Sequence, residues 1–258
     1  MTKYVFDEVS IGNNLTLYVD GNSKITLGNG SYDEPLPNAF SLPHISTCPG
    51  ATPQCMSSCY VAGLQKNAPD VYKKYAQNER VIHRILMAHP LLLRTAQVFG
   101  EWISEHCPDG FRWHVSGDIM NLRYASWIAK AVENSPQVRH WIYTRTFEAV
   151  PHLIFPNLAV NISADAHNYT VARQVALRWG VRLCYMTHDG SLPNDLKSGD
   201  VILPDYQLRG RDLDKPTEHE WWQGLSSEHK KMVCPPDFFG QSEKHRCGPC
   251  KKCLYPNG

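Results

Sequence analysis

The sequence predicts an α/β fold that combines a parallel sheet with a cysteine-rich C-terminal appendage. Short apolar runs alternate with helical patterns between residues 39 and 204, and this order favours parallel strands joined by helices. From residue 205 the alternation stops, and a charged stretch followed by clustered cysteines takes its place. We therefore expect three segments: strands and turns over 1–38, an α/β core over 39–204, and an appendage over 205–258.

Six segments of the core have the pattern of strands, because each is short, apolar and bounded by polar residues. They are residues 39–43, 111–115, 139–145, 157–163, 181–186 and 200–204. Six parallel strands can curl into a partial (β/α)6 barrel or stay open as a sheet. The periodicity favours neither arrangement over the other.

Helical patterns fill the intervals between the strands. Residues 68–106 carry apolar side chains at helical spacing, and Pro90 is predicted to separate two helices there. Residues 121–135 place apolar side chains on one face of a helix. Residues 168–180 begin with an asparagine typical of an N-cap and end with Gly180, typical of a helix C-terminus.

Composition and charge exclude some classes of protein. The 258 residues are 42% hydrophobic and 20% charged, and the formal net charge of +1 indicates no general attraction to nucleic acid. No run of 18 apolar residues exists, and the first residues lack an apolar signal segment. We expect no membrane partner and a cytoplasmic location, where structural disulfides are rare.

Nine cysteines are the most informative residues of the chain. Cys107 and Cys184 stand alone and are expected to be small buried hydrophobic side chains. The other seven form two groups: the loop cysteines Cys48, Cys55 and Cys59 within "CPGATPQCMSSCYVAG", and the tail cysteines Cys234, Cys247, Cys250 and Cys253. Because reduced thiolates bind zinc and iron–sulfur clusters, both groups are candidate metal ligands.

The two groups differ in the number of ligands they supply. Four tail cysteines suit either a tetrahedral zinc ion or a 4Fe–4S cluster with every iron ligated, and their close spacing favours the cluster. Three loop cysteines match an iron–sulfur cluster with one iron open to a small molecule. They also match a zinc ion whose fourth ligand is a histidine, an aspartate or water, and His44 is the nearest such side chain in sequence.

Polar residues follow the predicted strands, at the end of a parallel sheet where ligands bind. Candidate catalytic residues there are His114, Asp118 and Arg145, and candidate ligand contacts are Ser116, Gly117, Asp118, Ser163 and Asp165. Gly117 would let the backbone approach a ligand, and Asp118 would bind an amino group or cap the following helix. Ser163 and Asp165 would hold a ribose hydroxyl or form a turn.

Several of these stretches resemble an uncharacterised phage-encoded family, a mycobacteriophage gene-product-like domain. The resemblance rests on "GNSK", "AFSLP", "CPGATPQCMSSCYVAG", "FRWHVSGD", "WIYTR" and "CGPCKKC", and it covers most of residues 20–253. It implies no particular activity. A phage origin would place the protein in the host cytoplasm.

A more distant resemblance is to radical S-adenosylmethionine enzymes. It implies a six-stranded partial barrel, a 4Fe–4S cluster with an open iron on the loop cysteines, and Tyr60 as the aromatic beside it. It also implies that 116–118 contact the methionine moiety of S-adenosylmethionine, that Ser163 and Asp165 contact its ribose, and that the tail holds an auxiliary cluster. The loop spacing, Cys-x6-Cys-x3-Cys with Tyr60 after the third cysteine, departs from the usual Cys-x3-Cys-x2-Cys. The alternative is that the two cysteine groups converge on one cluster.

Three functions follow as hypotheses. The first is an iron–sulfur enzyme similar to radical S-adenosylmethionine enzymes, with one or two 4Fe–4S clusters and an unidentified small-molecule or nucleic-acid substrate. The second is a zinc-bearing, transglycosylase-like enzyme that modifies nucleic-acid bases, with Asp118 and another strand-end aspartate as nucleophile and base. The third is a non-catalytic binding protein that a metal stabilises.

Overall fold

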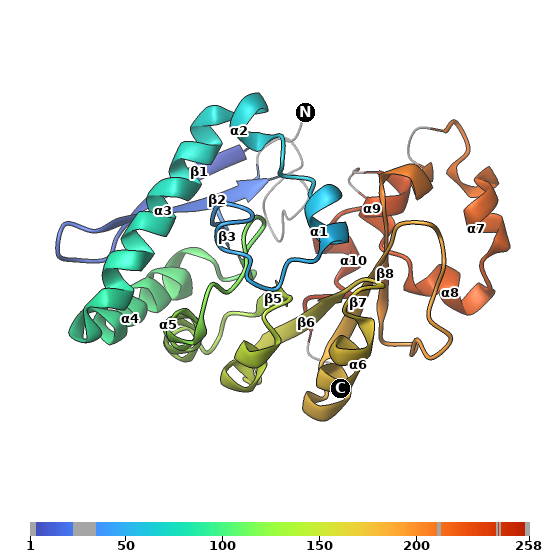
Figure 1. Ribbon diagram of the computed structural model, residues 1–258. Helices are drawn as coiled ribbons and strands as arrows, with labels where there is room; N and C mark the ends of the chain where they lie inside the picture. Colours follow the sequence, from blue (N-terminus) through green and yellow to red (C-terminus); the bar gives the residue numbers. More distant parts are fainter. Residues whose placement is uncertain (1–3, 23–34, 211–212, 241, 243, 256–258) are drawn as a thin grey trace.

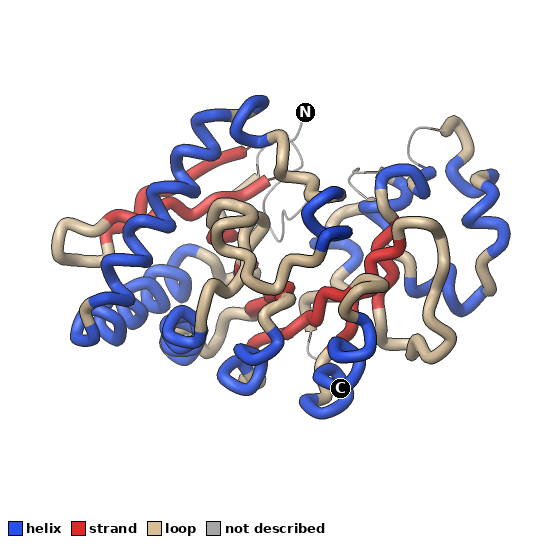
Figure 2. Tube along the Cα trace, in the orientation of Figure 1, coloured by secondary structure: helices blue, strands red, loops and turns tan. Residues whose placement is uncertain are grey.

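The computed structural model of the protein describes residues 4–22, 35–210, 213–240, 242 and 244–255. Its eight strands form one sheet, and their order in the sheet is their order in the sequence (Figures 1 and 2). They are β1 (Tyr4–Ser10), β2 (Thr16–Asn22), β3 (Ala39–Phe40), β4 (Phe111–Trp113), β5 (His140–Thr144), β6 (Leu158–Ala164), β7 (Arg182–Thr187) and β8 (Val201–Pro204). The fold is thus a mixed α/β fold with a mostly parallel sheet.

The six predicted strands are all present, as the parallel strands β3 to β8. The sheet is larger than those six strands, because β1 and β2 form an antiparallel hairpin that pairs with β3. Val9, Leu17 and Val19 of this hairpin are buried and join the main hydrophobic core. The segment 1–38 therefore contributes to the same sheet as the α/β core, while the part of it over residues 23–34 lies outside the described residues.

Helices lie between the parallel strands and follow the last of them. The long ones are α3 (Pro69–Met87), α4 (His89–His106), α5 (Leu122–Glu133) and α6 (Tyr169–Trp179). Pro90 lies in the first turn of α4, and the Gly180 that ends α6 has a φ of +64°, so both sequence signals are confirmed. The short ones are α1 (Pro53–Ser57), α2 (Leu64–Asn67), η1 (Phe147–Leu153), η2 (Tyr206–Leu208), η4 (Pro216–Glu218), α7 (Glu220–Gly224), α8 (Ser227–Met232), α9 (Pro235–Phe239) and α10 (Cys247–Cys250).

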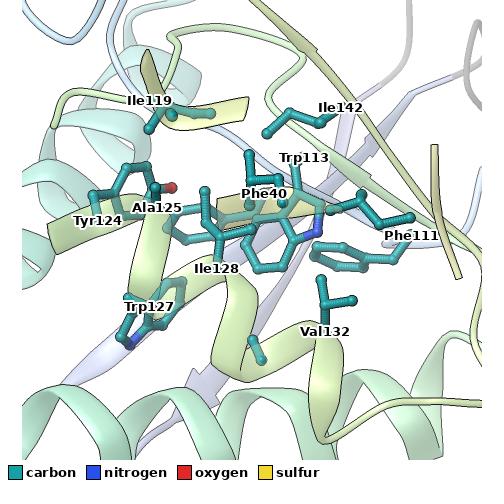
Figure 3. Packing of buried hydrophobic residues seen from close by; sticks show 14 of the residues in the cluster. Phe40, Phe111, Trp113, Ile119, Tyr124, Ala125, Trp127, Ile128, Val132 and Ile142 are labelled. Carbon is teal, nitrogen blue, oxygen red and sulfur yellow. The ribbon is translucent and has the colours of Figure 1, made fainter. Parts of the chain in front are cut away.

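The main hydrophobic core lies between one face of the sheet and the long helices. Figure 3 shows Phe40 and Trp113 from the short strands β3 and β4 beside Trp127 and Ile128 of α5. All four side chains are fully buried. Since β3 and β4 have only two and three residues, these large aromatic side chains are what hold the short strands against the helices.

We expect a Trp127→Ala substitution to lower the free energy of unfolding by about 3–5 kcal/mol, because it removes a fully buried indole. The indole nitrogen also donates a hydrogen bond to Thr95 Oγ1 at 3.1 Å, and the ring stacks on Phe99 at 5.2 Å. Urea unfolding measures the change. Trp179→Ala, at a half-buried ring on α6, is the matched control and should cost clearly less.

The opposite face of the sheet is covered by the C-terminal segment. Alternate residues of a strand point to opposite faces, so Trp141 and Ala159 point away from the long helices and pack against Leu254. Asn161 Nδ2 donates to the carbonyl oxygen of Cys253 at 3.1 Å, and Arg182 donates to that of Tyr255 at 3.0 Å. The tail is therefore fixed to the middle strands of the sheet. Figure 1 shows α7 and α8 at the right of the view, beyond β8, and α10 nearer the middle of the molecule.

Among the described helices, none combines the length and the apolar character needed to cross a membrane.

Candidate functional site

The loop that carries Cys48, Cys55 and Cys59 is tied to the carboxyl ends of four parallel strands. Beyond β8, Asp205 accepts a hydrogen bond from Ser58 at 2.7 Å, and beyond β6, Asp165 accepts one from Thr52. Tyr60 donates its hydroxyl to the carbonyl of Val115, just after β4. Beyond β5, Gly50 lies so close to the Arg145 carbonyl that a Cβ would come within 2.2 Å of the oxygen. The loop thus spans the end of the sheet where ligands of parallel α/β folds bind.

The three loop thiols are half-buried neighbours that act on one another electrostatically. Burial, helped by the negative charges of Asp118 and the other two thiolates, raises the pKa of Cys48 to about 12. Burial also raises the pKa of Cys55, and the positive charge of Arg145 opposes this shift. Cys48 and Cys55 are consequently protonated at neutral pH, so a metal that binds them must displace their protons.

Asp118 is buried and fixes the backbone beyond β4 and β5. Its two carboxylate oxygens accept hydrogen bonds from the backbone N–H groups of Ile119 at 2.7 Å and Arg145 at 2.8 Å. Burial raises its pKa to about 6, although these hydrogen bonds favour the charged form. Asp118 does not cap the following helix, since Asn121 Oδ1 accepts from the Tyr124 N–H and is the N-cap of α5.

Arg145 and Asp165 form a buried ion pair at 2.7 Å beneath the loop. Asp165 is fully buried and accepts two further hydrogen bonds, from Thr52 of the loop and from the backbone N–H of His167 at 2.9 Å. The hydrogen bonds of this carboxylate therefore connect the loop to the sheet. A ribose hydroxyl could reach it only by displacing one of these partners.

Three consecutive predicted contacts, Ser116, Gly117 and Asp118, lie in the turn after β4. Gly117 has a φ of +82°, and a Cβ there would lie 2.6 Å from Thr47 Oγ1, so the close approach of the loop requires glycine. Ser116 is buried, and its hydroxyl has no hydrogen-bond partner within the described residues. The turn after β4 therefore packs closely against the segment that contains Thr47, and within the described residues the Ser116 hydroxyl there has no hydrogen-bond partner.

His114 belongs to the core and is not part of the loop site. Its Nε2 lies 2.8 Å from the hydroxyl of Tyr124 on α5, and its Nδ1 has no partner among the described residues. Burial lowers its pKa to about 3, so the ring is neutral at physiological pH. Neither nitrogen contacts the cysteine loop in this arrangement. Ser163 lies half-buried on β6, opposite Cys184 of β7 in the strand register.

Three of the tail cysteines, Cys234, Cys247 and Cys253, lie against the other face of the sheet. Cys184, which stands alone in the sequence, lies beside them. Cys184 is fully buried, as expected, but it packs with Cys253 and with the partly buried Cys234. Hydrogen bonds from Cys184 and from Tyr143 lower the pKa of the Cys253 thiol, helped by the nearby guanidinium groups of Arg182 and Arg112. The sequence carries one signal for this contact. Alternate residues of β7 point to opposite faces of the sheet, so Cys184 faces away from the core that contains Leu183 and Tyr185.

Within the described residues, no group of three or more His, Cys, Asp or Glu side chains is placed so that all of them could bind the same metal ion. This finding concerns ligands that share an ion. The corner cysteines of a 4Fe–4S cluster each bind a different iron and therefore lie farther apart.

Fold and site together define an α/β protein with a cysteine loop fixed across the carboxyl ends of its parallel strands. The chain belongs to the Gene product 88 family, which it matches over residues 15–256. This confirms the resemblance to a phage gene-product family that the sequence motifs indicated. The comparisons do not show the more distant resemblance to radical S-adenosylmethionine enzymes.

Two curated relatives come from mycobacteriophages. The chain is 28% identical over 173 residues to the Gene 88 protein of Mycobacterium phage L5, a match that covers 64% of this chain and 69% of the relative. It is 26% identical over 173 residues to the Gene 88 protein of Mycobacterium phage D29, covering 64% and 68%. No solved structure matches the chain.

Proposed function

We propose that the protein is an iron–sulfur enzyme of a type similar to radical S-adenosylmethionine enzymes. Cys48, Cys55 and Cys59 would hold a 4Fe–4S cluster with one open iron, and tail cysteines would hold a second cluster. The observation that carries the proposal is the position of the loop. Three neighbouring thiols lie across the carboxyl ends of parallel strands that follow one another in sequence order, as a partial barrel requires.

The donor set fits such a cluster. Three soft thiol ligands without a fourth leave one iron free for a small molecule, and S-adenosylmethionine has an amino and a carboxyl group that can occupy it. When bound, the reduced cluster supplies the electron that cleaves S-adenosylmethionine and so starts hydrogen abstraction from a substrate. Reduced thiols are required throughout, in keeping with the expected location in a reducing cytoplasm.

The residues around the loop would position this cofactor more than react with it. Arg145 places a positive charge beside the thiols and so stabilises their deprotonated forms. Asp118 and Asp165 hold the turn and the loop through buried hydrogen bonds, which makes them positioning residues. Tyr60, which is 61% exposed, and the half-buried Ser163 are the side chains that would contact a bound molecule.

The contacts of the aspartates give less support to the base-modifying alternative. A nucleophile or general base needs a carboxylate oxygen within reach of the substrate. The oxygens of Asp118 accept backbone hydrogen bonds, and Asp165 is fully buried in an ion pair. A zinc ion shared by the loop or tail cysteines is likewise less well supported, given the placement of the described side chains.

Purification without oxygen tests the proposal. We expect brown protein with bound iron and sulfide, and formation of 5′-deoxyadenosine or methionine when the reduced protein meets S-adenosylmethionine. Cys55→Ala should remove one cluster of about four irons and abolish that cleavage. Cys107→Ala, at a buried cysteine outside both groups, is the control and should retain both. Colourless protein with zinc and no iron would contradict the proposal.

A further inference from the structure

Cys184 of β7 lies inside the group of tail cysteines, on the face of the sheet that the C-terminal segment covers. Its side chain packs with Cys253 and Val201, and the partly buried Cys234 joins the same cluster. The thiols of Cys184 and Cys253 also interact with each other electrostatically. Three thiols that are far apart in the sequence therefore meet on one face of β7 and β8.

Each of these three thiols is held by the sheet. Cys184 is a residue of β7 itself. The backbone N–H of Cys234 donates to the carbonyl of Ile202 on β8 at 2.8 Å. The carbonyl of Cys253 accepts from Asn161 of β6 at 3.1 Å. A ligand set positioned by regular strands is more rigid than one positioned by a loop alone.

Tyr143 connects a fourth thiol to this group. The partly buried side chain of this β5 residue packs against the cluster of Cys184 and Cys253, and it interacts electrostatically with these two thiols and with Cys247. Cys247 packs against the same face of the sheet, beside Trp141 and Ala159. By contrast, the contact that the structure gives for Cys250 is a backbone one within the turn of α10, from its N–H to the Arg246 carbonyl.

The charges around the group suit bound thiolates. Arg182 is buried, yet its hydrogen bonds go to the neutral oxygens of Gly199, Asn161 and Tyr255. Arg112 is also buried, with its guanidinium 5.2 Å from the Tyr143 ring, and the carboxyl groups of Asp237 and Asp20 act on it electrostatically. A buried cation such as Arg182 is costly unless an anion compensates it, and a centre bound by four thiolates would provide that negative charge.

We propose that Cys184, Cys234, Cys247 and Cys253 are the four ligands of the C-terminal metal centre, and that Cys250 is not a ligand. The inference rests on the second cluster of the proposed function. It replaces a ligand set taken wholly from the tail by one in which the sheet supplies a thiol.

The test measures iron, sulfide and zinc per chain in a Cys55→Ala background, so that metal in the tail is measured separately from the loop. We expect Cys184→Ala to lose the remaining metal, as Cys253→Ala does. Cys250→Ala is the matched variant within the tail and should keep it, as should Cys107→Ala. Retention of metal by Cys184→Ala together with its loss from Cys250→Ala would overturn the inference.

A second measurement remains informative if Cys184→Ala fails to fold. Iodoacetamide should modify Cys250 in the metal-loaded, otherwise unaltered protein without release of metal, as mass spectrometry of the modified protein would show. Release of metal in proportion to Cys250 modification would overturn the inference. Zinc lost in the predicted pattern of variants would support the ligand assignment while contradicting the iron of the proposed function. A tail without any metal would overturn both.

Discussion

Asp165→Asn should lower the free energy of unfolding by about 3–5 kcal/mol, because it leaves a buried guanidinium without its counter-charge. The side chains of Asp165 and Arg145 are 0% and 8% exposed, so water cannot replace the lost partner. The same substitution weakens the hydrogen bond from Thr52, which ties the cysteine loop to β6. Urea unfolding measures the loss of stability, and the iron content measures the effect on the loop.

Asp195→Asn is the control for this prediction. Asp195 forms an ion pair with Arg173 at 3.5 Å, but its side chain is 62% exposed. Solvent screens such a pair, so the expected cost stays below about 1 kcal/mol. Equal losses in the two variants would show that the buried pair beneath the loop contributes no more than a surface pair does.

The second large effect is a dependence of stability on pH that arises at Asp20 of β2. Burial raises the pKa of this carboxyl from 3.8 to about 7, against the hydrogen bonds from Ser41 and Tyr75 that favour its charged form. The folded protein therefore keeps a proton that the unfolded chain has released. Stability contributed by this group is fully present below about pH 4, falls as the pH rises towards 7, and is then constant.

Asp20→Asn removes this dependence, because an amide does not titrate. From pH 4 to 7 the variant should gain stability relative to the original protein, by up to on the order of 4 kcal/mol. Chemical denaturation at a series of pH values measures the difference. Asp70→Asn, at a side chain that is 86% exposed on α3, is the control and should follow the original protein throughout. A constant difference between Asp20→Asn and the original protein would show that Asp20 is already charged at low pH.

Much of the fold could be predicted because its signals are local. The six parallel strands are apolar runs, Pro90 starts α4, and Gly180 ends α6. Each signal depends on a few neighbouring residues whose backbone preferences are strong. The hairpin β1–β2 carries the same alternation, but its pairing with β3 depends on a contact between segments about twenty residues apart, which periodicity does not report.

The candidate site was predictable in place but not in detail. The loop cysteines and the residues after each strand were found from their position, because parallel strands end at a common edge. What each side chain contacts was not predictable. Asn121 rather than Asp118 caps α5, and His114 turns into the core towards Tyr124. Cys184 had no sequence neighbour to suggest its contact with Cys253, since that contact forms only when the tail folds onto the sheet.

The hydrogen bonds that fix the cysteine loop to the sheet determine the order in which the protein can fold. Tyr60, Thr52 and Ser58 bond to residues 55, 113 and 147 positions away, respectively. Contacts that close such long stretches of chain are entropically costly and form late. On a ribosome, Ser58 can dock only after Asp205 has emerged. The loop cysteines are therefore synthesised early but covered late. For most of the synthesis of the chain, their thiols are exposed to the other molecules of the cell.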